Sequence, residues 1–309
     1  MLKKIIRKIA LKLGRQIEPM KRKKNVFVEN KKALIAIEQS DKKIEQRIKA
    51  AMSAIGGFSK VISPGDSVLI KPNFVFAKKY PVTTSLDFLS VVIKQCFKSG
   101  AKEVVVGESS AFWLDTEEIM KKIHAIKAIE KAGAKVCFFD QEKCVKVNIK
   151  SKYIKNSFFP VEAFKHDKII FLPTLKTHRH SRFTCAIKLA FGFLQQNSRK
   201  KIKHSRNMGK KIADVNLAIH PDLILIDARK AMVTGGPAKG KIVCPNLILA
   251  TGDIVAADIE GLKILLSYNE KNHLKFKNPY SYDQIKQAAK KGLGVKSEKE
   301  IKVINIAAE

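Results

Sequence analysis

Lysine, histidine and asparagine side chains lie close together in two short motifs of this 309-residue chain. The first motif is Lys71-Pro72-Asn73, and the second is Lys176-Thr177-His178. A lysine ammonium binds carboxylate or phosphate groups, or acts as a base when burial lowers its pKa. An imidazole transfers protons near neutral pH. The two motifs predict an anion-binding site with acid–base chemistry. The alternative for the first motif is a solvated lysine beside a turn-forming asparagine. The alternative for the second is that a loop of a lysine-rich chain contains lysine and histidine by chance.

Carboxylates follow apolar runs in a chain that has 28 acidic and 60 basic residues. A carboxylate near either motif would poise a proton transfer or coordinate a hard divalent cation. Asp253 also stands where a helix is expected to begin, so helix capping is its alternative role. The predicted catalytic residues are Lys71, Lys176, His178 and Asp253, and the predicted ligands for a divalent metal are Glu108 and Asp227.

A glycine-rich segment, T-G-G-P-A-K-G, covers residues 234–240. Glycines let backbone N–H groups approach an anion closely, and an ordinary turn is the alternative. The spacings of a Walker loop and of a dinucleotide-binding fingerprint are both absent. The residues predicted to bind the small anionic ligand are Asn73, Thr84, Lys188, Gly235, Gly236 and Gly240.

Apolar runs and amphipathic segments alternate from residue 33 onward, and the apolar runs are continuous. Continuous runs are typical of parallel strands covered on both faces, so the predicted fold class is α/β with a mainly parallel sheet. Ligands bind such sheets beyond the carboxyl ends of the strands, where the polar residues above are expected to gather. The expected strands are 33–37, 67–70, 104–106, 135–139, 168–172, 223–226, 247–250 and 303–306. The expected helices are 42–55, 86–98, 116–131, 183–194, 255–266 and 282–291, with residues 176–178 in a loop.

The first thirty residues differ from the rest of the chain. Their apolar residues fall on one arc of a helix and their basic residues on the other, and a basic run follows at 21–24. We predict a basic arm at 1–30 and an α/β domain at 31–309, with lobes 31–150 and 151–309 as a further division. The arm is suited to an anionic membrane surface or a nucleic acid. Packing against its own domain or a sister subunit is the alternative, and the oligomeric state stays open.

The net charge of +32 is extreme, but only nine of the 60 basic residues are arginine. Nucleic-acid surfaces rely on arginine for bidentate and stacking contacts. The charge therefore favours general, salt-sensitive attraction of anions over a dedicated nucleic-acid site. No apolar run approaches the roughly 18 residues of a membrane span, and no signal-peptide core is present. We expect a cytoplasmic protein, with peripheral membrane contact through the arm as the alternative.

Five cysteines occur, at positions 96, 137, 144, 185 and 244, and none forms a C-x-x-C pair. Their spacing matches neither a zinc site nor an iron–sulfur site. Free, reduced thiols are expected, and no iron–sulfur cluster is expected.

The same motifs resemble the family called domain of unknown function 362. The resemblance rests on I-K-P-N at 70–73, T-T at 83–84, G-E-S at 107–109, L-K-T-H at 175–178, K-L-A-F-G at 188–192, D-A at 227–228, G-G-P at 235–237 with Gly240, and Asp253. The family tends to have asparagine where this chain has Leu189. Some relatives carry ferredoxin-type four-cysteine segments, which implies a redox setting, but this chain lacks those cysteines. Three functions stay open: an enzyme acting on a small anion, a binding protein for polyanions or membranes, and a redox accessory protein.

Overall fold

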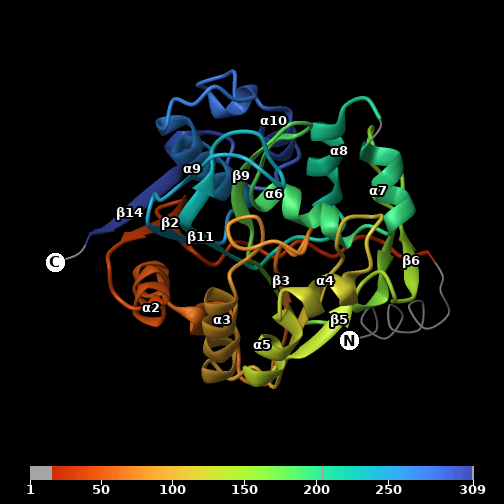
Figure 1. Ribbon diagram of the computed structural model, residues 1–309, viewed down its shortest axis with the longest axis horizontal. Coiled ribbons are helices and arrows are strands. Elements are labelled where there is room, and N and C mark those ends of the chain that lie inside the picture. Colours follow the sequence, from red (N-terminus) through yellow and green to blue (C-terminus); the bar gives the residue numbers. More distant parts are fainter. Residues whose placement is uncertain (1–15, 204, 308–309) are drawn as a thin grey trace.

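One large sheet of mostly parallel strands forms the centre of the protein in the computed structural model, which describes residues 16–203 and 205–307 (Figure 1). The strands follow the order β1-β2-β13-β11-β8-β3-β4-β5, β14 pairs with β2, and β9 and β12 pair with β11. β10 pairs with β9, and β6 with β7 forms a separate hairpin. The bounds are β1 Val28–Glu29, β2 Lys32–Gln39, β3 Ser67–Lys71, β4 Glu103–Glu108, β5 Lys135–Phe138, β6 Cys144–Val147, β7 Ser157–Pro160, β8 Lys168–Phe171, β9 Thr174–His178, β10 Arg182–Thr184, β11 Leu223–Met232, β12 Ile242–Val243, β13 Leu247–Thr251 and β14 Ile301–Ala307.

Helices cover both faces of this sheet, as the sequence predicts. Figure 1 shows α2, α3 and α5 on one side of the sheet and α8, α9 and α10 on the other. Each side has its own apolar core, because the central strands are buried along their whole length and present apolar side chains to both faces. The bounds are α2 Ile44–Ile55, α3 Leu86–Lys98, α4 Thr116–Lys122, α5 Ala125–Lys131, α6 Ala186–Leu189, α7 Gln196–Lys203, α8 Met208–Val215, α9 Ile254–Ser267 and α10 Asp283–Lys290, with short 3-10 turns η1 Phe58–Lys60, η2 Val161–Phe164, η3 Ala190–Phe193, η4 Pro279–Ser281 and η5 Glu298–Glu300.

The predicted α/β class is confirmed, and four strands, β1, β10, β12 and β13, are antiparallel to the strands they pair with. β13 runs antiparallel to both of its neighbours, β11 and β2. No helix lies between β11 and β13, and without a crossover helix the chain returns along the sheet in the opposite direction. The carboxyl end of β13 therefore lies at the opposite edge of the sheet from the carboxyl ends of β3, β4 and β8.

Three local predictions were wrong. Residues 176–178 belong to strand β9, which pairs with β10 in a hairpin. The helix predicted at 183–194 is replaced by β10, the single-turn α6 and η3, and the extended backbone of Cys185 separates β10 from α6. The helix predicted at 116–131 breaks at His124, which takes a left-handed conformation with φ of 59°.

The described part of the predicted arm lies along the domain. Ile17 and Phe27 are buried in the two cores, and Ile17 forms a bridge with Val147. A separate arm therefore does not extend to residue 30, and the helix predicted within residues 1–15 lies outside the described residues. The two predicted lobes share the central sheet, since β8 and β11 from the second half lie between β3 and β13.

Candidate functional site

A buried ion pair joins the carboxyl ends of β3 and β4. The ammonium of Lys71 contacts the carboxylate of Glu108, and the two side chains are only 1% and 3% exposed. The same carboxylate accepts the backbone N–H groups of Phe74 and Ser109, each at 2.7 Å. These donors occupy the oxygens of Glu108, so the predicted role of this residue as a metal ligand would require the ion pair to open.

Asn73 and Thr84 hold the segment that follows β3. The side-chain amide of Asn73 donates to Thr174 Oγ1 at 3.0 Å, and its backbone N–H donates to Thr84 Oγ1 at 2.9 Å. Thr84 in turn donates to the carbonyl of Leu172 at 2.9 Å. Asn73 lines a small cavity beside the ion pair, whereas the buried Thr84 positions the backbone, so its geometry favours support over direct ligand contact.

This small cavity has a volume of about 80 Å³ and is lined mainly by cationic and polar side chains. Gly192 leaves room for Lys71, because a Cβ atom at this glycine would lie 3.0 Å from Lys71 Cε. Among the described lining residues, Glu108 is the one carboxylate. The lining residues include Lys71, Asn73, Glu108, Ser109, Thr184, Lys188, Gly192 and Arg199.

Two buried polar atoms at the cavity, Thr184 Oγ1 and Arg199 Nε, lack hydrogen-bond partners among the residues that the structure describes. The half-buried Lys188 lines the same cavity. The other guanidinium nitrogens of Arg199 donate to Ser109 and to the carbonyl of Ser110, which fixes the side chain at the cavity wall. Buried polar groups are almost always satisfied in native proteins. The unsatisfied set therefore indicates that a polar molecule belongs in the cavity.

Burial changes the acid–base behaviour of the lysines at this site. Burial, with the charge of Lys188 as a further cause, lowers the pKa of Lys176 to about 7. Burial also lowers the pKa of Lys188 to about 8 and that of Arg199 to about 10. Burial lowers the pKa of Lys71 as well, although Glu108 opposes that shift. Arg199 thus stays cationic at neutral pH, while Lys176 and Lys188 exchange protons close to it.

Lys188 lines the cavities at this site, whereas Lys176, which was also predicted, does not. Lys188 lines both the small cavity and a neighbouring larger cleft. Lys176 lines neither, and its ammonium donates to the carbonyl of Val82 at 2.5 Å in the protein interior. The arrangement favours Lys188 over Lys176 as the lysine that meets a ligand.

The larger cleft opens beside the small cavity and has a volume of about 510 Å³. Val75, Lys188, Phe191 and Arg199 line both spaces, so the two lie next to each other. The cleft falls within the roughly 300–1,000 Å³ that ligand pockets usually have. Its other lining residues include His178, Arg179, Lys203, the segment 235–239 and the aromatic residues Phe76, Phe112 and Trp113.

His178 is held as a neutral hydrogen-bond donor. Its Nδ1 accepts the backbone N–H groups of His180 at 3.1 Å and Ser181 at 3.2 Å. Burial, followed by the positive charges of Lys188 and Lys176, lowers the pKa of His178 far below its usual range. A neutral ring whose Nδ1 accepts carries its proton on Nε2. This geometry favours a donor of a hydrogen bond over the proton-transferring group that the sequence predicts.

The glycine-rich segment packs backbone against backbone on β9. A Cβ atom at Gly236 would lie 1.8 Å from the carbonyl oxygen of Thr177, and one at Gly240 would lie 1.9 Å from that of Thr234. Gly235 and Gly236 also have φ of 63° and 69°, which favour glycine. Gly235 and Gly236 line the cleft, and Gly240 shapes the turn behind them.

Two predicted carboxylates lie outside this site. Asp227 Oδ2 lies 2.7 Å from Arg229 Nη2, and the carboxylate accepts hydrogen bonds from the hydroxyl groups of Ser85 and Tyr80. Among the described ranges, no three histidine, cysteine, aspartate or glutamate side chains are grouped as metal ligands would be. The residues present therefore do not assemble the divalent-metal site expected from Glu108 and Asp227.

The prediction that Asp253 joins the cleft was wrong, because β13 is antiparallel and places this residue at the other edge of the sheet. Asp253 caps α9 by accepting the N–H groups of Val255 and Ala256, and it also accepts that of Val295. Burial raises the pKa of Asp253. Its position supports the capping alternative.

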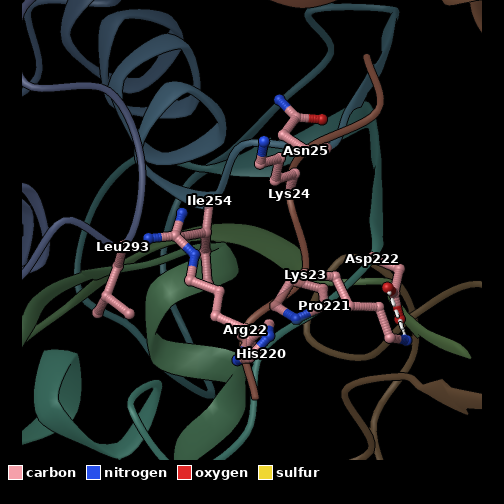
Figure 2. Close-up of a pocket in the computed structure, with 10 residues that line it drawn as sticks. Arg22, Lys23, Lys24, Asn25, His220, Pro221, Asp222, Ile254 and Leu293 are labelled. Atoms are coloured by element: carbon pink, nitrogen blue, oxygen red, sulfur yellow. Dashed lines mark hydrogen bonds and ion pairs between the residues drawn. The ribbon is translucent and has the colours of Figure 1, made fainter. Parts of the chain in front are cut away.

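A second hollow lies at that opposite edge, near Arg22, His220 and Asp222 (Figure 2). Figure 2 shows Lys23 in an ion pair with Asp222, and Lys23 Nζ lies 3.0 Å from Asp222 Oδ1. The hollow has room for about 20 Å³, which is close to the space that one water molecule needs. It is too small for the ligand expected here.

Sequence reasoning missed Arg199, Thr184 and the aromatic residues of the cleft. Arg199 is one of only nine arginines in a lysine-rich chain, and that rarity is the one signal that pointed to it. Thr184 and Trp113 stand in segments without a motif.

The fold and the site define an α/β protein with a cationic cleft at the carboxyl edge of its sheet. The family profile described as domain of unknown function (DUF362) matches residues 68–263, and the chain belongs to this family. The chain is 23% identical over 218 residues to a thylakoid-associated protein from Synechocystis sp.. The aligned region covers 68% of this chain and 66% of that protein.

Two solved structures are also similar to this chain. The lactate racemase apoprotein from Thermoanaerobacterium thermosaccharolyticum is 14% identical with a TM-score of 0.47, over 79% of this chain and 58% of that one. A structural-genomics protein from Thermotoga maritima is 14% identical with a TM-score of 0.41, and the match covers 78% of this chain and 62% of that one. This chain thus spans less than two thirds of the length of each relative named. Neither TM-score reaches 0.5, so we infer nothing from these two structures.

No helix within residues 16–203 and 205–307 is both long and apolar enough to cross a bilayer.

Proposed function

We propose that this protein is an enzyme that binds a small carboxylated or phosphorylated substrate in the cationic cleft. The observation that carries the proposal is the pair of unpartnered buried atoms, Arg199 Nε and Thr184 Oγ1, in a cavity that Lys188 also lines. An anion there would accept hydrogen bonds from all three groups. It would also offset a surplus of positive charge that Glu108 alone does not balance.

The residues divide into fixed and titrating groups. Arg199 supplies a permanent charge and an unpartnered Nε–H donor for a carboxylate or phosphate. Lys188, with its pKa near 8, is partly neutral at physiological pH and accepts a proton from the bound substrate. His178 donates a hydrogen bond through Nε2–H to an oxygen that gains negative charge as that proton leaves. The reaction class that this set supports is proton transfer next to an anionic group, as in an isomerase.

Two measurements test this proposal. A thermal-shift screen at fixed high salt compares short carboxylates and phosphate monoesters, and a ligand at a hundred times its Kd is expected to add about 2.7 kcal/mol of stability. Each stabilising compound is then incubated with the protein in D₂O, and NMR follows exchange of its C–H groups. We expect exchange with the wild type and none with Lys188→Arg, which keeps the charge but cannot accept a proton. The absence of any stabilising anion would overturn the proposal.

A second proposal concerns peripheral membrane contact, because the cyanobacterial relative is named a thylakoid-associated protein. The basic residues near the N-terminus would supply the attraction to an anionic bilayer. Replacing Lys3, Lys4 and Lys8 with glutamate is expected to abolish retention on vesicles that contain anionic lipid, while the core stays folded. Equal retention of this variant and the wild type would exclude a role for the N-terminus.

A further inference from the structure

The outer part of the large cleft is aromatic. Phe76 comes from the loop after β3, and Phe112 and Trp113 come from the loop after β4. The rings of Phe112 and Trp113 meet edge to face with centroids 4.6 Å apart. The ring centroids of Phe76 and Trp113 are 6.4 Å apart. Two separate loops thus build one aromatic wall, which we define as Phe76, Phe112 and Trp113.

Trp113 is 56% exposed. A large aromatic side chain that faces water forgoes the free energy that its burial would contribute. Such exposure next to a cleft is typical of a surface that a ligand covers.

The aromatic wall lies beside cationic side chains of the same cleft. The ammonium of Lys203 lies 4.7 Å from the centroid of Trp113 and 5.1 Å from that of Phe112, within cation–π range. Arg199 and Lys188 line the same cleft further in, where it joins the small cavity. The small cavity, at about 80 Å³, suits an anionic group, and the cleft of about 510 Å³ leaves space for a much larger body.

We propose that the ligand of this cleft carries its anionic group on a planar aromatic or heteroaromatic ring, and that Trp113 recognises the ring. The inference rests on the proposed function for the anionic group and adds the substrate class. Aromatic rings prefer offset-stacked or edge-to-face contacts, so the wall distinguishes a planar ring from a saturated body of similar size.

The chain contains a single tryptophan, so its fluorescence reports directly on the wall. The probes are phenylacetate against cyclohexylacetate and phenyl phosphate against cyclohexyl phosphate, with acetate and orthophosphate as the anions alone. We expect the phenyl compounds to change Trp113 fluorescence and to bind about tenfold more tightly than the cyclohexyl compounds, in line with the energy of an aromatic pair.

The matched variants are Trp113→Leu and Phe158→Leu, the second at an aromatic residue that is 40% exposed outside the cleft. Calorimetry on Trp113→Leu is expected to show loss of the phenyl preference with unchanged binding of acetate and orthophosphate, and Phe158→Leu is expected to keep both. Equal binding of phenyl and cyclohexyl compounds to the wild type would overturn this inference alone. Failure of every probe, including orthophosphate and acetate, would overturn the proposed function and this inference together.

Discussion

Lys71 and Glu108 form an ion pair across neighbouring parallel strands, with both side chains almost completely buried. The pair closes the base of the small cavity, and Lys71 also donates to the carbonyl of Pro72 at 2.8 Å. Glu108 is anchored independently by the backbone N–H groups of Phe74 and Ser109. The pair therefore fixes the shape of the site more directly than it contacts a ligand.

Breaking this pair is expected to cost stability. Lys71→Met leaves the Glu108 carboxylate without its buried counter-charge, and such a loss typically costs about 3–5 kcal/mol. Lys71→Met combined with Glu108→Gln is expected to lose less than the sum of the single variants, because no unpaired charge remains. Urea unfolding at pH 7 measures the free energies, and strictly additive losses would contradict the coupling.

The close approach of the glycine-rich segment to β9 predicts a contrast between two glycines. Gly236 and Gly292 have similar φ of +69° and +66°, but nothing lies within 4 Å of a Cβ atom at Gly292. Gly292→Ala is expected to lower the free energy of unfolding by about 1–2 kcal/mol, because alanine is disfavoured in the left-handed conformation. Gly236→Ala is expected to cost more and to weaken anion binding, since its Cβ would displace the backbone beside His178. Equal losses by thermal unfolding would argue against the packing described here.

The lowered pKa of Lys176 predicts a pH dependence of stability. In the unfolded chain this lysine titrates near 10.4, whereas in the folded protein its pKa is about 7. Between these values the unfolded state binds more protons, so the free energy of unfolding rises with pH. We expect Lys176 to contribute about 1 kcal/mol of such a rise between pH 7 and 8.

The comparison of wild type with Lys176→Met by urea unfolding at pH 7 and pH 8 measures this contribution. The variant is expected to show a correspondingly smaller rise. An identical rise in both proteins would show that the folded and unfolded pKa values of Lys176 are alike.

The position of Asp253 predicts a separation between stability and binding. Asp253→Ala removes the cap of α9 and is expected to lower the free energy of unfolding by about 1–2 kcal/mol. Because the residue lies at the opposite edge of the sheet, anion affinity is expected to stay unchanged. A large loss of affinity in a folded Asp253→Ala protein would restore the catalytic role first predicted for it.

The sequence allowed prediction of the parts of the site that follow parallel strands. Continuous apolar runs identified β3 and β4, and neighbouring parallel strands necessarily bring Lys71 and Glu108 to the same edge. The position of Asp253 did not follow from the sequence, because an apolar run does not reveal the direction of its strand. Direction depends on whether a helix intervenes, and the helix-free segment between β11 and β13 was the available clue.

Other residues of the site depend on contacts that no local pattern encodes. Arg199 contacts Ser109 and Ser110, which lie 90 and 89 residues earlier in the sequence. Thr184 reaches the cavity through a strand that was predicted as helix. Trp113 stands in an irregular loop. Tertiary packing, rather than periodicity or motif, places these side chains.

The most direct test of the central claim is calorimetric titration of orthophosphate at constant high salt into wild type, Arg199→Met, Lys188→Met and Lys127→Met. Lys127 is exposed on α5, so its variant removes the same charge without touching the cleft. We expect one binding site in the wild type and in Lys127→Met, and at least a tenfold loss of affinity in Lys188→Met and in Arg199→Met. Wild-type binding is expected to weaken above pH 8 as Lys188 loses its proton. Equal affinities in all four proteins would mean that the anion binds to the general positive surface, and the cationic cleft would not be the site.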